Sequence, residues 1–315
     1  MLKLKSLSGV IINIRNIEIK LKKLYLTVNP FGGHKKGPRI LKEVLPLFEK
    51  NNFDLTIIET EYAGHNKQLA MDVDMTDYDG FCCIGGDGTL SEVINGVMKR
   101  EDSLKFPIGL ITGGTGNSFM HDLECLDPVE AANQIISGKR RKIDIFSCKT
   151  DDKLFYGFNI LGWGIPTDAN LLADKMRWIG SQRYNIASIF EVLSHRKRFA
   201  RVTIDDNSIA ADFAFIIGCN TIHTGKGMKM APLARLDDGL IDLIIVRKVS
   251  RFKLLKLFPK VFSGNHISDP GVDYRQVKTF TILPEKNRQL NVDGEVLGST
   301  PVEVKVLPKE IEIMI

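Results

Sequence analysis

Strand-like and helix-like segments alternate along residues 24–147, and a glycine-rich loop follows three of the strand-like segments. The loops are Asn29–Gly33 (NPFGG), Gly85–Gly88 (GGDG) and Gly113–Asn117 (GGTGN). Parallel strands joined by crossover helices end at one edge of their sheet, where ligands bind. The alternation therefore predicts an α/β domain with three loops meeting at the carboxyl edge of a parallel sheet.

The spacing of apolar residues predicts the individual elements of this first half. Apolar side chains within 38–50 recur at helical spacing, whereas the segment 24–29 reads as a short buried strand. The predicted strands are 24–29, 54–59, 80–84, 107–111 and 143–147, and the predicted helices are 38–50, 65–73, 90–99 and a helical stretch ending near 137.

After about residue 150 the pattern changes to short strands separated by turns, which predicts a mostly antiparallel, β-sandwich-like second domain. The predicted strands are 155–161, 201–205, 212–219, 240–246, 277–283, 289–292 and 302–306, with helices at 168–179 and 250–262. We expect an N-terminal extension at 1–23, an α/β domain at 24–147 and a β-rich domain at 148–306. Residues 307–315 are candidates to return to the α/β domain.

Length and composition exclude several classes of protein. A chain of 315 residues is longer than the roughly 250–300 residues that one hydrophobic core usually serves. Its net charge of +5 is too weak for a nucleic-acid partner. Five scattered Cys without CxxC spacing, and six His without an HxxxH pair, argue against disulfides and zinc and favour a reducing compartment. No uncharged apolar run approaches the roughly 18 residues of a spanning helix.

The GGDG loop and the residues that follow it are the most informative segment for chemistry. Glycines let backbone N–H groups approach a phosphate, and a following helix adds the positive end of its dipole. Asp87 would repel that phosphate, so its presence suits a proton acceptor or a Mg²⁺ ligand. The structural alternative is a turn in which Asp87 caps a helix and Thr89 and Glu92 form a capping box.

Two acidic turns lie in the second half of the chain. Asn291–Glu295 (NVDGE) carries Asp293 and Glu295, which are candidates to bind Mg²⁺ or to act as a base at the phosphate site. In the second turn, Asp238 and backbone carbonyls, which we assign to Arg235 and Leu240, predict a hard-cation site. An ordinary hairpin or solvated turn is the alternative for each segment.

In chain order, these motifs resemble those of the lipid kinase family that unites diacylglycerol, sphingosine and ceramide kinases. The strings are VNPFGG (28–33), ETEYAGHN (59–66), GGDGTLSEVINGV (85–97), GGTGN (113–117), KMRWIGSQRY (175–184), MAPLARLDDGLIDL (230–243) and NVDGE (291–295). After residue 220, the strings NTIHTGKGMKMAP and VRKVSRFKLLKLF are most similar to those of the sphingosine-kinase branch. The resemblance implies that residues 24–147 are an ATP-binding α/β domain of the phosphofructokinase and NAD-kinase type. It implies that residues 148–306 are a β-rich lipid-substrate domain, with the active site between the two.

The resemblance also implies roles for individual residues. The residues implied to contact nucleotide are Asn29, Pro30, Phe31, Gly32, Gly33, Thr60, Gly85, Gly86, Gly88, Thr89, Glu92, Thr115, Asn117, Arg177 and Arg183. The two arginines suit bidentate pairing with phosphate. The implied catalytic residues are Asp87, Asp293 and Glu295. We expect Asp87 to deprotonate the lipid hydroxyl, while Asp293 and Glu295 organise Mg²⁺ and nucleotide; the alternative gives the base role to the 293–295 segment.

Two residues depart from the family pattern. Ser118 stands where bacterial relatives often have Asp, which weakens a Mg²⁺ network through that position. Asn170 stands where sphingosine kinases carry the acidic residue that holds the sphingoid amine, although Asp168 is acidic. We take Asp168 and Asn170 as candidate substrate residues, and the amide at Asn170 keeps diacylglycerol and ceramide open beside a sphingoid base.

We therefore expect an ATP- and Mg²⁺-dependent lipid kinase acting on a hydroxyl of a sphingoid base or a diacylglycerol. The alternatives are a kinase of soluble substrate similar to NAD kinases and a non-catalytic lipid or nucleotide sensor. We expect a cytoplasmic protein, peripheral at membranes, and a homodimer stays open. A basic amphipathic helix at 252–262 is a candidate for the membrane interface, with a core-facing helix as the alternative, and Leu171, Leu172, Met176 and Trp178 are candidates for an acyl pocket.

Overall fold

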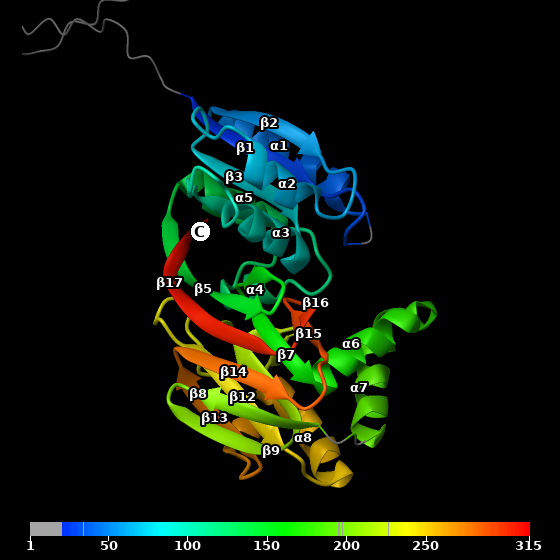
Figure 1. Ribbon diagram of the computed structural model, residues 1–315. Helices are drawn as coiled ribbons and strands as arrows, with labels where there is room; N and C mark the ends of the chain where they lie inside the picture. The colour runs from blue at the N-terminus through cyan, green and yellow to red at the C-terminus, as the bar shows by residue number, and fades with distance from the viewer. Residues whose placement is uncertain (1–20, 34, 195, 197, 226) are drawn as a thin grey trace, which may run out of the picture.

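The computed structural model describes residues 21–33, 35–194, 196, 198–225 and 227–315. The chain forms two lobes, and the strands β5 (Arg140–Thr150) and β17 (Val302–Met314) run between them as an antiparallel pair (Figure 1). Of the predicted N-terminal extension, residues 1–20 lie outside the described residues, whereas Lys22 and Lys23 already belong to β1 (Lys22–Val28).

The first lobe is built on a parallel sheet covered by helices on both faces. Its strands lie in the order β2 (Phe53–Glu59), β1, β3 (Gly80–Gly85) and β4 (Ile108–Thr112). Leu24, Leu26 and Val28 pack with α1 (Gly37–Lys50) and α5 (Pro128–Ser137) on one face, whereas Tyr25 packs with α2 (His65–Asp72) and α3 (Asp87–Val97) on the other. This alternation is the two-residue period of a strand buried on both faces.

Local sequence explains where these helices begin and which face they bury. In α1, Pro38 occupies the first turn, and Ile40, Val44 and Phe48 lie four residues apart on the buried face. In α5, the Asp127 carboxylate accepts the backbone N–H groups of Val129 and Glu130, which is the usual N-cap arrangement.

The second lobe is mostly antiparallel. Trp163, Phe213 and Phe280 are among its largest buried side chains. Its strands are β6 (Leu154–Gly157), β7 (Ile160–Gly164), β8 (Phe199–Ile204), β9 (Asn207–Cys219), β10 (His223–Thr224), β11 (Met228–Lys229), β12 (Ile241–Arg247), β13 (Val272–Val277), β14 (Thr279–Pro284), β15 (Gln289–Val292) and β16 (Glu295–Ser299). Its helices are α6 (Ile165–Lys175), η1 (Arg177–Gln182), α7 (Arg183–Ser194), α8 (Arg251–Ser263) and η2 (Asn265–Ser268), and the first lobe adds the short α4 (Ser118–Asp122).

Several predicted elements differ from the structure. The strand predicted at 155–161 is two strands, because a turn at residues 158–159 donates backbone N–H groups to Asp293. The strand predicted at 277–283 is the end of β13 followed by β14. The helix predicted at 168–179 starts at Ile165 and ends at Lys175, and the sequence pattern missed α7 altogether.

The end of the chain returns to the first lobe. Ile313 of β17 pairs in parallel with Ile108 of β4, and Ile311 and Ile313 lie in the core beneath α2 and α3. The domain boundary predicted between residues 147 and 148 falls inside β5, and the domain limits stay a prediction. Among the described residues, no helix is long and apolar enough to cross a membrane.

Candidate functional site

The three glycine loops lie directly against one another at the carboxyl ends of β1, β3 and β4. A methyl group built on Gly33 would lie 1.7 Å from the carbonyl oxygen of Gly113, and one on Gly86 would lie 2.8 Å from Cα of Gly114. Such contacts leave no room for a side chain, and Gly33 also has a φ of +57°. The loops therefore meet backbone to backbone, as the sequence predicts.

The first loop is shaped by Asn29. Its Oδ1 accepts the backbone N–H groups of Phe31 and Gly32, both at 2.9 Å, and folds residues 29–32 into a tight turn. Pro30 lies in this turn, and Phe31 is exposed. Thr60 is buried beside the loop, where its hydroxyl donates to the carbonyl of Val28 at 3.3 Å.

The third loop carries a polar atom without a partner. The Asn117 side-chain amide donates to the Gly114 carbonyl at 3.0 Å. Its Oδ1 is buried without a hydrogen-bond partner, whereas Thr115 is exposed at the loop surface. Buried polar atoms are normally paired, so this oxygen and the glycine backbone around it suit a bound nucleotide with its own hydrogen-bond donors.

Asp87 reaches across to the third loop. Its carboxylate accepts the backbone N–H of Ser118 at 2.8 Å and of Phe119 at 3.1 Å, so it caps the start of α4. Asp87 itself is the first residue of α3, whose N-cap residue, Gly86, offers no side-chain cap. The GGDG segment thus links two helices, one through its backbone and one through its carboxylate.

The capping box considered for Thr89 and Glu92 does not form. Glu92 instead accepts the backbone N–H of Gly64 at 2.8 Å. Thr89 is buried against Gly85, where a methyl group would lie 2.3 Å from the threonine Oγ1. The GGDG loop is therefore held by contacts distant in the sequence, and not by a cap of its own helix. Gly88 lies next to Glu295, whose Oε1 would be 3.5 Å from a methyl group there.

Asp293 is saturated by hydrogen bonds. It accepts backbone N–H groups from Phe158, Asn159 and Ile160 at 2.9–3.2 Å, and the Ser91 hydroxyl donates to it at 3.2 Å. Burial raises the pKa of Asp293 to about 7, and these donors work in the opposite direction. Ser91 belongs to α3 of the first lobe, and the other donors belong to the β6–β7 turn and the first residue of β7, so Asp293 connects the two lobes.

Glu295 differs from Asp293 in its surroundings. It is exposed, and desolvation by neighbouring groups together with the Glu92 carboxylate raises its pKa. The Asp293–Gly294 turn that carries it is held by Asn170, whose Nδ2 donates to the Gly294 carbonyl at 2.6 Å. Glu295 is therefore a carboxylate with a raised pKa, set on a fixed turn beside the GGDG loop.

Asp168 is committed to an ion pair. Its carboxylate lies 2.6 Å from the Arg198 guanidinium, whose side chain is fully buried and also faces Glu191 at 3.9 Å. Breaking such a pair would leave a buried charge without a partner. Asp168 and Asn170 both lie on α6, and both are already engaged with other parts of the protein.

The predicted phosphate-binding arginines lie at the α6–α7 junction. Arg183 begins α7 and is half-buried. Arg177 lies in η1, and its side chain lies outside the described residues. Leu172 and Met176 pack against the α6–α7 interface, whereas Trp178 is 84% exposed. The acyl-pocket role of this cluster stays a prediction.

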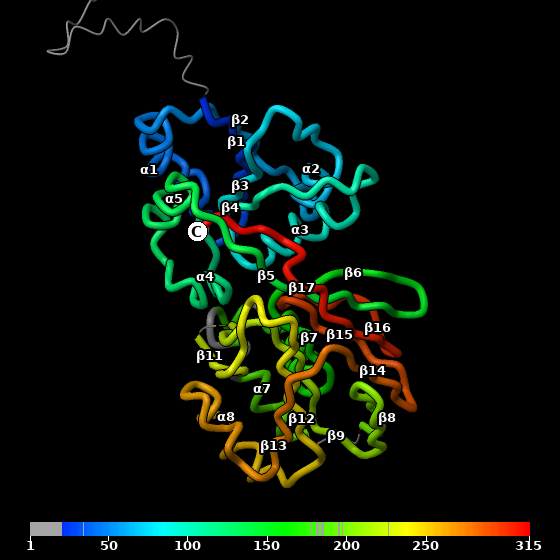
Figure 2. The backbone as a smooth tube through the Cα atoms, turned by 90° about the vertical axis from the view of Figure 1, so that its left-hand side faces the viewer, coloured from blue at the N-terminus to red at the C-terminus, as the bar shows by residue number. Residues whose placement is uncertain are grey.

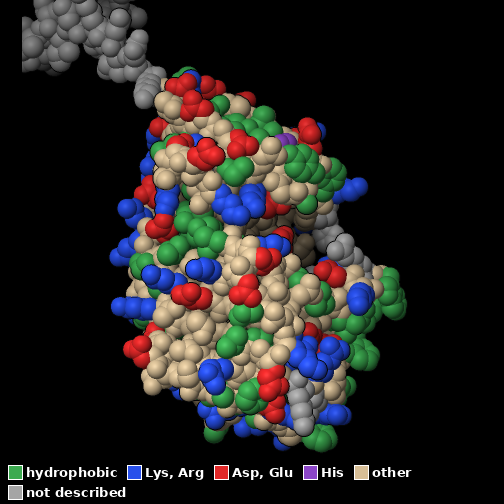
Figure 3. Space-filling view, in the orientation of Figure 1, with side chains coloured by type: hydrophobic (Ala, Val, Ile, Leu, Met, Phe, Trp, Pro, Cys, Tyr) green, Lys and Arg blue, Asp and Glu red, His purple; other side chains and the backbone are tan. Residues whose placement is uncertain are grey.

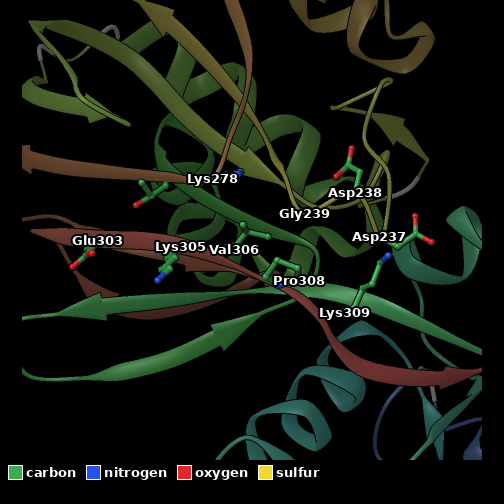
Figure 4. Close-up of a pocket in the computed structure, with 10 residues that line it drawn as sticks. Asp237, Asp238, Gly239, Lys278, Glu303, Lys305, Val306, Pro308 and Lys309 are labelled. Carbon is green, nitrogen blue, oxygen red and sulfur yellow. The ribbon is translucent and has the colours of Figure 1, made fainter.

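The predicted cation turn at 235–240 has its own hydrogen bonds. Asp238 accepts the N–H of Leu240 at 3.0 Å, and the Gly239 N–H donates to the buried Asp144 at 2.6 Å. An open hollow of about 670 Å³ adjoins this turn (Figure 4); the lining residues are Asp237, Asp238, Gly239, Lys278, Thr279, Glu303, Lys305, Val306, Pro308 and Lys309. None of them belongs to the glycine loops or to the 291–295 turn, so we do not regard the hollow as part of the site.

Sequence reasoning missed the residues that support the site. Ser91 donates to Asp293, and Asn95 exchanges two hydrogen bonds with the backbone of Tyr156. Both lie inside the GGDGTLSEVINGV string, one turn apart on α3. Two polar residues four positions apart in an otherwise buried helix were the available signal.

Comparison with known proteins identifies the family. Residues 23–148 match the diacylglycerol kinase catalytic domain, and residues 159–315 match the YegS C-terminal NAD kinase beta sandwich-like domain. The chain is 31% identical to sphingosine kinase 1 of Arabidopsis thaliana, covering 88% of this chain and 69% of that protein. It is 30% identical to a diacylglycerol kinase of Staphylococcus carnosus, covering 93% of this chain and 94% of that protein. The chain belongs to the family of diacylglycerol and sphingosine kinases.

The fold of this lipid kinase family member agrees with a solved structure. A diacylglycerol kinase from Bacillus anthracis superposes with a TM-score of 0.78 at 21% identity, covering 94% of this chain and 97% of that one. The predicted fold class, an α/β nucleotide-binding domain followed by a β-sandwich-like domain, is thereby confirmed, as is the predicted family. The roles of the individual site residues stay predictions.

Proposed function

We propose that this lipid kinase transfers the γ-phosphate of ATP, with Mg²⁺, to a hydroxyl group of a membrane lipid. The observation that carries the proposal is the backbone contact of the Asn29–Gly33, Gly85–Gly88 and Gly113–Asn117 loops beside the 293–295 turn. Backbone N–H groups in such loops suit a polyphosphate. The glycine cradle and the unpartnered Oδ1 of Asn117 both fit a nucleotide.

A divalent cation fits beside two neighbouring carboxylates. Glu92 and Glu295 are close enough for the Glu92 charge to contribute to the raised pKa of Glu295, and a cation bound at Glu92 would relieve their repulsion. Within the described part of the chain, no group of three or more His, Cys, Asp and Glu side chains is arranged to hold a metal ion. We therefore assign Mg²⁺ to the nucleotide phosphates with Glu92 as its protein ligand, which leaves the Glu295 carboxylate unbound, and the turn at Arg235, Asp238 and Leu240 stays a second, separate prediction.

For the proton acceptor, we favour Glu295 over Asp87. Both oxygens of Asp87 already accept backbone N–H groups of α4, and Asp293 already accepts four donors. Glu295 is exposed, its pKa is raised, and it lies beside Gly88. A carboxylate with a raised pKa is a better match to a base working near neutral pH. Bound ATP supplies the phosphoryl group and Mg²⁺ neutralises its charge, so the protein's part is mostly to hold the reacting groups in line.

The surroundings of α6 favour a neutral lipid over a sphingoid base. A sphingoid ammonium needs a free carboxylate, but Asp168 is paired with Arg198, and Asn170 is an amide bonded to the Gly294 carbonyl. A diacylglycerol hydroxyl has no such requirement. We therefore place diacylglycerol before a sphingoid base as substrate.

Peripheral contact with the membrane is supported by an exposed apolar surface on the second lobe. Trp178, Phe190 and Phe252 are 84%, 57% and 78% exposed, and they belong to η1, α7 and α8. Hydrophobic side chains gather at the right-hand edge of Figure 3, over the end of α6 and over α7. The exposed Arg251 and Lys256 of α8 suit anionic headgroups. We propose that this surface, defined by Trp178, Phe190 and Phe252, contacts the lipid bilayer.

Transfer of labelled phosphate from ATP to a micelle panel tests the function. The panel holds diacylglycerol, sphingosine and ceramide, with NAD as the soluble control. We expect label in diacylglycerol, a loss of two or more orders of magnitude in kcat for Glu295→Gln, and wild-type rates for the surface control Glu49→Gln. The wild-type rate should fall with decreasing pH through the raised pKa of Glu295, because the base must be ionised.

The other outcomes are equally informative. Label in sphingosine alone would place a sphingoid base before diacylglycerol as the substrate. Label in NAD alone would contradict the assignment of a lipid substrate. If Asp87→Asn abolishes kinase activity and Glu295→Gln retains it, the proton acceptor is Asp87. ATP binding without label in any acceptor would favour a sensor.

A further inference from the structure

The short helix α4 holds a hairpin of the second lobe through Asp122. One Asp122 oxygen accepts the backbone N–H of Ile222 at 2.6 Å. The other accepts the backbone N–H of His223 at 3.0 Å and lies 2.7 Å from the His223 ring Nδ1. The Asp122 side chain is only 4% exposed. All three donors come from the entry to the β10–β11 hairpin, so one carboxylate fixes both the backbone and the ring at that point.

The opposite end of α4 makes a second tie to the same hairpin. The Ser118 hydroxyl donates to the Gly225 carbonyl at 3.3 Å. Figure 2 shows α4 facing the β10–β11 hairpin across the junction of the two lobes. A helix of five residues is too short to be stable by itself. Its position therefore depends on the contacts at its two ends.

The same helix holds Asp87. The backbone N–H groups of Ser118 and Phe119 donate to the two oxygens of that carboxylate. A methyl group on Gly116 would lie 3.6 Å from Asp87 Oδ2 and 3.8 Å from the Gly225 carbonyl oxygen. The hairpin, the third glycine loop and the GGDG carboxylate thus converge on one small region of the site.

We propose that Asp122 and His223 form a latch between the lobes that positions α4, and through α4 the Asp87 carboxylate and the phosphate loops. Both are positioning residues, because they act through α4 and not on the reacting atoms. The inference rests on the proposed function for its kinetic consequence, whereas the coupling from Asp122 to the Ser118 and Phe119 N–H groups stands on geometry alone.

The pairing also fixes the state of the His223 ring. With Asp122 as the acceptor at Nδ1, the neutral ring carries its proton on Nδ1. The His121 ring lies 5.4 Å away, centroid to centroid, at 34°, and covers one side. An Asn side chain can present an N–H at the position of Nδ1, which a Leu side chain cannot.

Hydrogen exchange and kinetics on Asp122→Asn test the latch. We expect faster amide exchange at Ile222 and His223 and, as the transmitted effect, at Ser118 and Phe119. We also expect kcat to fall on the order of tenfold to a hundredfold, as for a small misplacement of catalytic groups, with KM for the lipid within about twofold. His223→Leu should reproduce this loss, and His223→Asn should retain most of the wild-type rate.

Asp127→Ala is the control. Asp127 accepts two backbone N–H groups at the start of α5, so its truncation to Ala removes a helix cap without touching the hairpin. It should lower the melting temperature about as much as Asp122→Asn and leave kcat unchanged. Equal kcat losses in the two variants would overturn the latch.

Two further outcomes separate the latch from the proposed function. If His223→Asn loses as much activity as His223→Leu and alters the pH profile, then His223 takes part in proton transfer and the positioning role is wrong. If the wild-type protein phosphorylates no lipid, the proposed function fails. The latch is then decided by exchange at Ser118 and Phe119 alone: faster in Asp122→Asn supports it, and unchanged exchange refutes it.

Discussion

Gly33 shows how strongly a single position constrains this site. Its φ of +57° and the 1.7 Å approach to the Gly113 carbonyl oxygen mean that an Ala there adds both backbone strain and a clash. We expect Gly33→Ala to destabilise the fold by about 1–3 kcal/mol and to weaken ATP binding at least tenfold. Chemical denaturation and calorimetric titration with ATP measure the two effects.

The control for this residue is Gly138→Ala, at the end of α5. Gly138 has a φ of +75°, but only the flexible end of Lys22 lies within 4 Å of a methyl group there. The Gly138→Ala variant therefore has the backbone strain of a positive φ without a backbone clash. We expect it to lose about 1 kcal/mol of stability and to bind ATP with unchanged affinity. Equal ATP affinities in the two variants would mean that the loops do not contact nucleotide.

At the scale of residues, the sequence indicates which side chains are candidates for the site, but it does not predict the hydrogen-bond partners of those side chains. The patterns GGDG and NVDGE single out Asp87, Asp293 and Glu295, and in the structure Glu295 lies beside Gly88, while the catalytic roles of the three stay predictions. These patterns cannot predict that Asp87 caps α4 or that Asp293 is saturated, because their partners lie 31 to 202 positions away in the chain. Hydrogen bonds of that range depend on the tertiary fold.

At the scale of elements, α8 shows both the success and the limit of periodicity. The apolar stripe predicted at 252–262 is a helix, but it divides between two environments. Leu254, Leu257 and Val261 are buried against the lobe, whereas Phe252 and Phe262 are exposed. The core-facing interpretation holds for one face and leaves the other available to a membrane. Periodicity identifies the helix, and only the packing shows which apolar residues remain outside.

The helix α7 was missed for a related reason. Ile189, Phe190 and Leu193 are exposed, so its apolar residues do not follow a single core-facing stripe. The long strand β17 was predicted only as 302–306, because Pro308 and Lys309 interrupt the apolar alternation at that point. In both elements the surroundings, and not the local pattern, decide the structure.

The exposed faces of α7 and α8 give a prediction about membrane binding. We expect the double variant Phe190→Ser with Phe252→Ser to bind anionic liposomes at least tenfold more weakly, because burying one Phe is worth about 1.5–3 kcal/mol. Sedimentation with vesicles containing phosphatidylserine measures the change. Leu154→Ser, an exposed apolar residue on β6, is the control. If the double variant binds as the wild type does, the surface is not a membrane contact.

At the scale of the whole molecule, β17 joins the two cores. Val302, Val304 and Val306 lie in the core of the second lobe with Trp163, whereas Ile311 and Ile313 lie in that of the first lobe. The Ser91–Asp293 hydrogen bond adds a second connection. A rigid strand that contributes to both cores couples their stabilities, so we expect the lobes to unfold together.

Tryptophan fluorescence can test this coupling, because the chain has two Trp and both belong to the second lobe. In a Trp178→Phe background, the buried Trp163 reports on that lobe alone. Ile313→Ala removes a side chain buried in the first-lobe core and should cost about 2–5 kcal/mol. If the lobes unfold as one unit, the Trp163 transition shifts to lower denaturant together with far-ultraviolet circular dichroism. The exposed Glu303→Ala on the same strand should shift neither signal. A circular dichroism transition that moves while the Trp163 transition stays in place would show that the lobes unfold separately, with β17 able to leave the first core while the second remains intact.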